Sequence, residues 1–254
     1  MATVIELGAV EGFILDDPVA GVLDNTVYTL GGTVFKDITS RVISATTSRG
    51  KNRDLDRFSS GTLNITASNE DRAFDPNYAS SPYAGAIVPR REVRVTVDGV
   101  RVISTTIDDW NYGYSPDGSS RAEIVATDEF TLLARQVLTA GTATPQLSGA
   151  RVSAVLDMLS VAWPDDKRSI DVGESTLGAD VFSGNALQYL QKISDSEQGL
   201  LFIAKNGDLV FRDRLDATPT TASLTDFTDD GTGIPFTLTA VNYGSELLYN
   251  QAVV

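Results

Sequence analysis

The sequence contains no cysteine and no histidine. Without cysteine, the chain cannot form disulfides, thiolate nucleophiles or zinc–thiolate sites. Without histidine, it lacks the usual near-neutral general base, which excludes a Ser-His-Asp triad and a histidine-ligated metal. A catalytic site would have to use carboxylates, lysine, tyrosine or a bound cofactor. We therefore expect a protein that is not an enzyme and holds no cofactor or metal.

Positive charge and long apolar runs are also scarce. The chain has 20 Lys and Arg against 34 Asp and Glu, a net charge of −14, which predicts no specific nucleic-acid readout. No apolar run approaches the roughly 20 residues that span a membrane as a helix, and the start MATVIELGAV lacks the basic segment of a secretory signal. We expect a soluble, unexported chain without a transmembrane segment.

The first 127 residues are rich in Val, Ile, Thr and aromatic residues, with repeated turn signals, which is typical of a β barrel or sandwich. Residues 41–50 and 61–69 alternate apolar and polar residues, as strands buried on one face do. Residues 91–107 predict a hairpin that turns at Asp98-Gly99. The turn 115–118 then leads into a strand over residues 119–127.

Helical periodicity begins only after this region. Asp128 is placed to cap a short helix over residues 130–136, and Ser148 to cap a helix over residues 148–161. A third helix is expected from Ser183 to Ser196, with Gly199 as its C-cap. The apolar residues that we expect to point inward are Val152, Val155, Leu156, Leu159, Leu187, Leu190 and Ile193.

The end of the chain returns to β character. Residues 199–214 predict a hairpin that turns at Asn206-Gly207. Residues 215–233 are polar and rich in turn residues, and residues 234–254 resume a strand pattern. Because the chain ends on the β-type run QAVV, we expect its last strand to belong to a sheet that residues beyond 254 complete.

Two acidic clusters invite a functional interpretation. Asp108, Asp109 and Trp110, with Tyr112 and Tyr114 nearby, resemble an aromatic carbohydrate site, which makes a host-surface glycan-binding or glycan-cleaving module the alternative function. Neighbouring strand residues point to opposite faces, however, so both acids line one cleft only if a bulge intervenes. A second cluster resembles a loose calcium loop, which leaves a cation open there: Asp226, Asp229 and Asp230.

The segment NEDRAFDP, residues 69–76, packs three acids and an arginine between a predicted strand and a string of turn residues. Asn69, Asp71 and Asp75 can accept backbone N–H groups in Asx-type turns, and Arg72 can bridge carboxylates with its planar fork. Pro76 fixes its own φ and favours an extended Asp75. These properties predict a structural joint with neither substrate nor metal.

The same region carries a family resemblance. The residues match, in order, the patterns R-x-L-D-x-F-x-x-G, N-x-D-x-x-F-D-P, S-P-Y and P-x-x-P-V-R, except that Arg90-Arg91-Glu92 stands where a second proline is common. These patterns are similar to the N-terminal signature of minor tail proteins of long-tailed bacteriophages. Residues 126–135, 183–214 and 233–254 resemble later parts of the same family. The structural motif residues are Leu55, Asp56, Arg57, Phe58, Gly61, Asn69, Asp71, Arg72, Phe74, Asp75, Pro76, Pro82, Tyr83, Pro89 and Arg94.

The resemblance implies a baseplate or tail-tip hub. The expected fold is mainly β with α+β: a tube-like β barrel, then a small helix-helix-hairpin α+β domain, then the start of a second β barrel. The domains would be residues 1–147, a tail-tube-like barrel, 148–214, an α+β insertion, and 215–254, a linker with the first strands of a further β domain.

The resemblance also implies the role and the partners of the protein. It would be a structural virion protein of the tail tip, made in the host cytoplasm and without catalytic residues. Its expected partners are two further copies in a homotrimer, the distal tail protein, the tape measure protein and other tail-tip proteins. Genome DNA would pass transiently through the lumen.

Overall fold

The computed structural model describes residues 2–11, 18–19, 21–22, 33–51, 56–139 and 141–217. They belong to one compact unit that ends at Ala217. The expected linker and strands of residues 215–254 therefore lie outside the described residues from 218 onward, as do Leu55 and the three aspartates of the loose calcium loop. The domain boundaries remain predictions.

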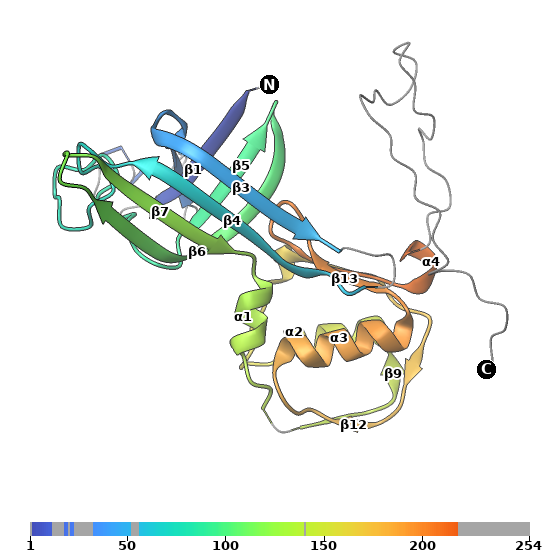
Figure 1. The fold of residues 1–254 in the computed structure, drawn as a ribbon. Coiled ribbons are helices and arrows are strands. Elements are labelled where there is room, and N and C mark those ends of the chain that lie inside the picture. Colours follow the sequence, from blue (N-terminus) through green and yellow to red (C-terminus); the bar gives the residue numbers. More distant parts are fainter. Residues whose placement is uncertain are drawn as a thin grey trace, which may run out of the picture. The chain divides into compact units, whose positions relative to one another are not determined.

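The larger part of the unit is an antiparallel seven-stranded sheet with the strand order β2-β1-β5-β6-β7-β4-β3 (Figure 1). Its strands β1 and β2 were not individually predicted, whereas the two predicted hairpin strands and their neighbours occur close to the expected bounds. The bounds are β1 Thr3–Glu11, β2 Thr33–Asp37, β3 Val42–Gly50, β4 Ser59–Ser68, β5 Glu92–Val97, β6 Val100–Tyr114 and β7 Ser120–Thr127.

The sheet must curl, because its two edges are joined by a very short connection. Strands β2 and β3 lie at opposite edges, yet only residues 38–41, including the 3-10 helix η1 (Thr39–Arg41), separate them. This connection can span at most about 18 Å. Six strand spacings in a flat sheet would cover about 29 Å. Within the described strands, β2 and β3 do not pair with each other, so the sheet is a curled, barrel-like layer with two edges.

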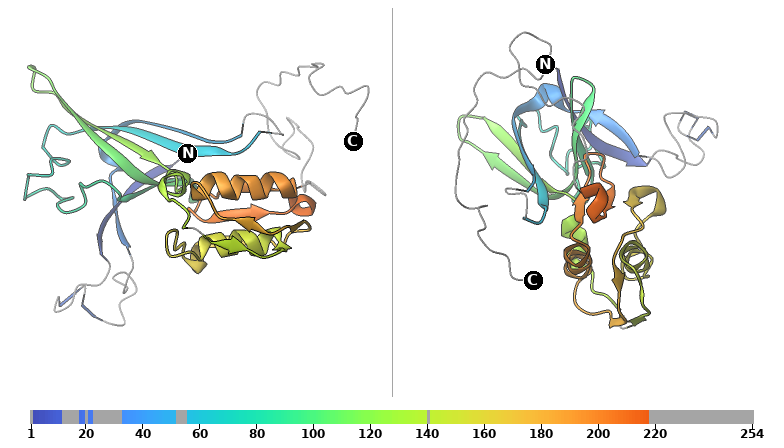
Figure 2. Two further views of the ribbon diagram at one scale, coloured as in Figure 1. Left: turned by 90° about the horizontal axis from the view of Figure 1, so that it is seen from below. Right: turned by 90° about the vertical axis from the view of Figure 1, so that its right-hand side faces the viewer.

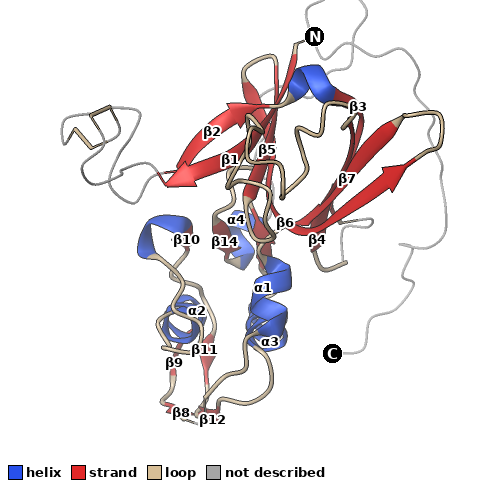
Figure 3. Ribbon diagram, turned by 90° about the vertical axis from the view of Figure 1, so that its left-hand side faces the viewer, coloured by secondary structure: helices blue, strands red, loops and turns tan. Residues whose placement is uncertain are grey.

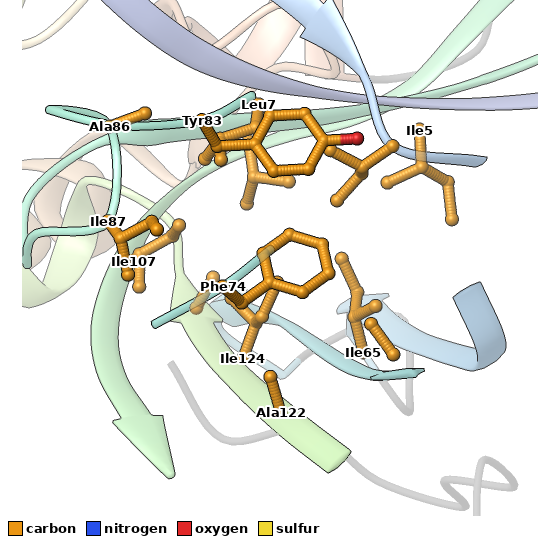
Figure 4. Close-up of a cluster of buried hydrophobic side chains, with 14 of the residues drawn as sticks. Ile5, Leu7, Ile65, Phe74, Tyr83, Ala86, Ile87, Ile107, Ala122 and Ile124 are labelled. Atoms are coloured by element: carbon orange, nitrogen blue, oxygen red, sulfur yellow. The ribbon is translucent and has the colours of Figure 1, made fainter. Parts of the chain in front are cut away.

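One face of this sheet is closed by the loop of residues 69–91. Strand alternation buries Leu63, Ile65 and Ala67 of β4 on that face. Loop residues Phe74 and Tyr83 pack against them in the same cluster. Figure 4 shows the two aromatic rings between Ile5 and Leu7 on one side and Ile65, Ala122 and Ile124 on the other. The loop thus fills the hollow of the curled sheet.

A second apolar cluster follows the sheet in the chain. Helix α1 (Phe130–Arg135) leaves β7, and helices α2 (Ser148–Leu156) and α3 (Ala186–Glu197) pack against each other and against the hairpin of β13 (Leu200–Ile203) and β14 (Leu209–Arg212) (Figures 2 and 3). Strand β10 (Arg168–Ile170) adds to β14 in parallel. The remaining short elements are β8 (Thr142–Ala143), β9 (Gln146–Leu147), η2 (Asp165–Lys167), β11 (Thr176–Leu177), β12 (Asp180–Val181) and α4 (Arg214–Ala217).

Three details of the predicted helices are wrong. Ser148 does not cap α2, because its hydroxyl donates to Glu197 Oε2 at 2.7 Å. Leu159 does not point inward: α2 ends at Leu156, and Leu159 is 99% exposed. The third helix starts at Ala186 behind an Asn185 cap, and the left-handed residue at its end is Gln198 rather than Gly199.

Other predictions are confirmed. The hairpin between β5 and β6 turns at Asp98-Gly99, where both residues have positive φ. The expected cap at Asp128 is an exception: the N-cap of α1 is Glu129, although the carboxylate of Asp128 accepts the N–H of Phe130 at 3.1 Å. The mainly β class with an α+β part is also confirmed. Among the described residues, no helix is long and apolar enough to cross a membrane.

Candidate functional site

The loop of residues 69–84 is a chain of tight turns with a period of three residues. The backbone N–H groups of residues 72, 75, 78, 81 and 84 each donate to the carbonyl three residues earlier, at 2.9 to 3.1 Å. Pro76 and Pro82 stand at the second position of two of these turns, where their fixed φ suits the turn. The repeated turns let a segment without strands or helices satisfy its own backbone while it enters the hollow of the sheet.

Asn69 is the buried start of this loop. Its side chain is fully buried, and its Oδ1 accepts the N–H of Phe74 at 2.8 Å. Its backbone N–H donates to the carbonyl of Ser120 on β7 at 2.8 Å. Asn69 therefore ties the first turn both to the sheet and to the aromatic residue that enters the core.

Charged residues hold the outer side of the loop. Both carboxylate oxygens of Asp71 accept hydrogen bonds from Arg41 Nη1, and Oδ1 also accepts the N–H of Ala73 at 3.2 Å. The hydrogen bond from Arg41 is the main reason that the pKa of Asp71 lies below its usual value. Arg41 stands in η1, the corner between the two edge strands, and nothing in the local sequence marks it as the partner of Asp71.

Arg72 and Asp75 form the second pair. Arg72 Nε and Nη2 donate to Asp75 Oδ2 at 3.0 and 2.6 Å, and this contact lowers the pKa of Asp75. Arg72 adopts φ +61°, and its guanidinium lies 5.3 Å from the ring centre of Tyr78. Asp75 Oδ1 accepts the N–H of Asn77 at 2.9 Å. Asp71 and Asp75 of NEDRAFDP are thus engaged within the loop and with Arg41.

The aromatic residues of the motif meet in the core. The rings of Phe74 and Tyr83 are stacked, with centres 5.1 Å apart and planes 10° apart. Tyr83 also donates its hydroxyl to the carbonyl of Asp37, the last residue of β2, at 3.3 Å. Lys36 Nζ donates to the carbonyl of Pro82 at 2.6 Å. The loop is therefore fixed to the edge strand β2 as well as to the core.

The earlier motif residues lie elsewhere and join the sheet to the second cluster. Phe58 packs on Phe202 of β13, with ring centres 5.0 Å apart, and Arg57 pairs with Asp195 of α3. Gly61 donates its N–H to Asp128 Oδ2 at 2.6 Å, and a Cβ at this position would lie 3.0 Å from that oxygen. Asp56 is exposed at the start of this segment.

Asp128 is a buried carboxylate between β4 and α1. Besides Gly61, its carboxylate accepts the hydroxyl of Ser60 at 2.7 Å. Burial raises the pKa of Asp128, although these hydrogen bonds act in the opposite direction. The contact explains why glycine occupies position 61.

Arg94 and Pro89 complete the motif near β5. Arg94 Nε donates to Glu6 Oε2 on the neighbouring strand β1 at 2.7 Å, and its guanidinium lies 3.5 Å from the ring centre of Phe35. Pro89 precedes a bulge at which both Arg90 and Arg91 bond to Ile107 of β6. The structure therefore brings Asn69 to Tyr83 together in one loop but separates Asp56 to Gly61 and Arg94 from it.

Two of the three aromatic residues considered for a carbohydrate site, Trp110 and Tyr112, pack against the core of the sheet. Trp110 packs on Phe74, with ring centres 6.0 Å apart, and donates Nε1 to the carbonyl of Val88 at 3.3 Å. Tyr112 packs on the same core, and burial raises its pKa to about 12. Tyr114 is 67% exposed. A platform of three rings for a sugar is therefore not formed by these residues.

Of the two acids beside Trp110, Asp108 lies in a bulge in the pairing of β6 with β7, between Ile107 and Asp109. Asp108 accepts the hydroxyl of Thr127 at 2.5 Å and lies 3.9 Å from Arg90 and 3.8 Å from Arg135. Asp109 is exposed. Within the described residues, no group of three or more carboxylates could hold a metal ion.

Sequence reasoning missed a buried polar centre in the second cluster. The carboxylate of Glu197 is fully buried and accepts hydrogen bonds from the Ser148 hydroxyl, from the N–H groups of Glu174 and Ser175, and from Arg214 Nε at 3.2 Å. Burial alone would raise its pKa, but these hydrogen bonds outweigh burial and lower the pKa to about 2. Its partners are 17 to 49 residues away, so no local pattern could reveal them.

Comparison with known proteins places the fold. No known family model matches the sequence, and no curated protein matches it. Solved structures do match. The 43 kDa tail protein of prophage MuSo2 from Shewanella oneidensis aligns with a TM-score of 0.52 at 17% identity, over 90% of this chain and 58% of its own. A tail protein from Neisseria meningitidis aligns with a TM-score of 0.51 at 14% identity, over 83% of this chain and 50% of its own. This chain thus spans somewhat more than half of the first protein and half of the second, and it has the fold of these two tail proteins.

Proposed function

We propose that the chain is a structural component of a bacteriophage tail tip or baseplate hub, of the minor tail protein family. In this role it forms a ring that continues or closes the tail tube, supports DNA passage and attaches other tip proteins. The observation that carries the proposal is the shared fold with a prophage tail protein over 90% of this chain. The family signature seen in the sequence agrees with it, because most of its described residues serve packing and hydrogen bonding of the fold.

The ring would form through the two edges of the curled sheet. Among the described strands, β2 and β3 each lack a partner on one side. The regularly paired stretch of β3, Ser44 to Ser48, is exposed and uncharged, so it lacks the charges that commonly protect an edge from strand addition. Head-to-tail pairing of β3 with β2 of the next copy can close a ring, and we propose a homotrimer. The distal tail protein, the tape measure protein and other tip proteins would flank this ring in the virion, after synthesis in the host cytoplasm.

The outward face of strands β3, β4, β7 and β6 suits a lumen wall. Two rows of residues that are paired across these strands carry only hydroxyl, amide, apolar or acidic side chains. The first row is Ser44, Thr66, Glu123 and Asn111, and the second row is Thr46, Asn64, Val125 and Asp109. The one arginine nearby, Arg121 of β7, stands at the end of this face. Acids repel the phosphates of passing DNA, and a surface with few bases cannot hold them. A lumen lined mainly by Arg and Lys in the assembled particle would contradict this assignment.

Cysteine cross-linking tests the ring directly, because the natural chain has no cysteine. One cysteine replaces Thr46 on β3, and a second replaces, in turn, each residue of β2 from Thr33 to Asp37. Paired strands bring Cα atoms within the reach of a disulfide. Double variants should give disulfide-linked trimers under oxidation, whereas each single variant should give no species larger than a dimer. A chain that stays monomeric in native mass spectrometry and forms no cross-linked trimer would contradict the ring.

Position in the virion needs a second experiment. Electron microscopy of phage particles with a tag on this chain should place the label at the tail tip. A label distributed along the tail or absent from the particle would contradict the proposed role. A phage that lacks this protein should fail to assemble tails, because the proposed role of the protein is structural.

A further inference from the structure

A cleft of about 400 Å³ lies between the curled sheet and the second apolar cluster. Its volume falls within the range of pockets that hold small ligands, roughly 300 to 1,000 Å³. Its lining comes from β2, the start of β5, β6, α1, the segment after α2 and the turn between β13 and β14. Apart from Thr33 of the edge strand β2, none of its lining residues belongs to the proposed ring contacts.

One wall of the cleft is apolar. Leu132 of α1, Val161 and Trp163 form it. The indole N–H of Trp163 already donates to the carbonyl of Lys167 at 2.8 Å, so the ring has no polar atom left to satisfy. This wall can accept an apolar group without leaving a buried donor unpaired.

The lining also holds cations with unused hydrogen-bonding capacity, although Arg91 Nη2 donates to the carbonyl of Gly85 at 3.3 Å. Arg90, Arg91 and Lys167 line the cleft. Arg90 approaches Asp108 and Glu129 only at 3.9 and 3.8 Å, beyond hydrogen-bond length. The Nε of Arg91 is buried and has no partner among the described residues. Three cations around one cleft, of which Arg90 and Arg91 are incompletely hydrogen-bonded, favour an anionic group there.

The two acidic residues in the lining do not cancel the preference of the cleft for an anionic group. Glu129 accepts the hydroxyl of Thr106, and Glu92 is the other carboxylate of the lining. Burial raises the pKa of Glu92, which makes its charged form less favourable. The cations therefore outnumber the acids, in a chain whose net charge is −14.

Arg90 also occupies a strained backbone position. Its φ is +69°, and it is the first residue of a bulge in which Arg90 and Arg91 oppose Ile107. Glycine is the usual residue at such a left-handed bulge position, because any Cβ is unfavourable there. Since the side chain of Arg90 makes no hydrogen bond of normal length that would explain its presence, the strain points to a role for this side chain outside the fold.

We propose that this cleft binds a carboxylate carried next to an apolar side chain on a neighbouring protein of the assembly. The apolar group would pack on the wall around Trp163, and the carboxylate would accept hydrogen bonds from Arg90, Arg91 and Lys167. The occupant is a protein segment because the cleft is large enough for a few side chains and its charge complements acidic protein surfaces such as this chain's own. The choice of occupant rests on the proposed role as an assembly subunit.

Peptide titration of the purified chain tests the site. The probe is the peptide acetyl-Gly-Phe-Glu-Gly-amide, and the matched control is the same peptide with Gln in place of Glu. Binding of each peptide is measured by tryptophan fluorescence and by calorimetry. We expect saturable binding of the acidic peptide with a Kd near or below about 1 mM and binding of the Gln peptide about tenfold weaker. Free 3-phenylpropionate, which offers the same chemistry as a small molecule, should bind more weakly than the acidic peptide.

Two variants separate a ligand-binding Arg90 from a merely structural one. Arg90→Gly should weaken peptide binding at least about tenfold while the urea midpoint of unfolding stays the same or rises, because glycine fits the positive φ. Arg135→Ala removes a cation equally close to Asp108 but outside the cleft, and should leave binding unchanged.

Several outcomes would overturn the proposal. These are equal affinity for the two peptides, no saturable binding, tighter binding of phenylpropionate than of the peptide, or a fall in stability of Arg90→Gly with binding retained. The readout is independent of ring formation, so a trimer that binds no peptide would reject the cleft and leave the proposed function standing.

Discussion

The ring of Phe74 stacks on the ring of Tyr83, with centres 5.1 Å apart, inside the hollow of the curled sheet. Phe74 is fully buried, and Tyr83 reaches the last residue of β2 with its hydroxyl. One aromatic pair therefore joins the core to the edge strand that we assign to ring contacts. Damage to this pair should affect folding first and assembly as a consequence.

Replacement of Phe74 by alanine should lower the free energy of unfolding by about 3 to 5 kcal/mol, because it leaves a large cavity in a closed core. Tyr83→Phe removes only a hydrogen bond and should cost about 1 kcal/mol. Urea unfolding followed by circular dichroism measures both. Tyr114→Phe is the control, since Tyr114 is 67% exposed and should unfold like the natural chain. A Phe74→Ala protein as stable as this control would refute the role of the loop as a core plug.

Asn69 and Asp71 are two residues apart in the motif but should differ in their effect. Asn69→Ala leaves the buried N–H of Phe74 without its acceptor and should cost about 1 to 3 kcal/mol. Asp71→Asn weakens a largely exposed pair with Arg41, which solvent screens, and should cost less than about 1 kcal/mol. The urea midpoints of unfolding of the two variants show which substitution destabilises the fold more. A larger loss for Asp71→Asn would mean that the surface pair, not the buried amide, fixes the joint.

The success of sequence reasoning depended on how local each signal was. Asp98-Gly99 and Asn206-Gly207 specify hairpin turns by their own conformational preferences, and both turns were predicted. Ser148 looked like a helix cap, but Glu197, 49 residues away, takes its hydroxyl. Leu159 fitted the helical period, yet the chain leaves the helix at Leu156 and adopts positive φ at Ala162.

The candidate site followed the same pattern. The Asx-type bonds and the Arg72 bridge of NEDRAFDP lie within a few residues and can be expected from side-chain chemistry. The pairing of Asp71 with Arg41 and the stacking of Phe74 on Tyr83 depend on how the sheet curls. Strand periodicity alone does not determine that curl, because it fixes which face is buried but not how strands are ordered.

Three glycines should rank by what a Cβ would meet. At Gly149 it would lie 1.8 Å from the carbonyl oxygen of Asp171, at Gly61 it would lie 3.0 Å from Asp128 Oδ2, and at Gly178 nothing lies within 4 Å. Gly149→Ala should therefore cost at least about 3 kcal/mol or prevent folding, since backbone must move. Gly61→Ala should cost less, and Gly178→Ala should stay close to the natural chain as the control from the same part of the fold. Urea midpoints in any other order would contradict the packing described for these positions.

Glu197 should make stability fall in acid. Its pKa is lowered to about 2 in the folded chain from an ordinary value of 4.5, so the folded state holds its proton less tightly than the unfolded state does. The resulting stabilisation, on the order of 3 kcal/mol, is fully present above pH 4.5 and is lost as the pH falls from there toward 2. Asp128 acts in the opposite direction, because burial raises its pKa. The contribution of Glu197 must therefore be isolated by a variant.

The variant is Glu197→Gln, which keeps the shape and removes the charge. It should be less stable than the natural chain at pH 7, because the amide satisfies fewer of the donors that surround the carboxylate. The difference should shrink as the pH approaches 2. Urea unfolding at several pH values between 2 and 7 measures it, with Glu123→Gln, an exposed acid on β7, as the matched control. A difference between Glu197→Gln and the natural chain that stays constant across this range would show that the charge of Glu197 does not stabilise the fold.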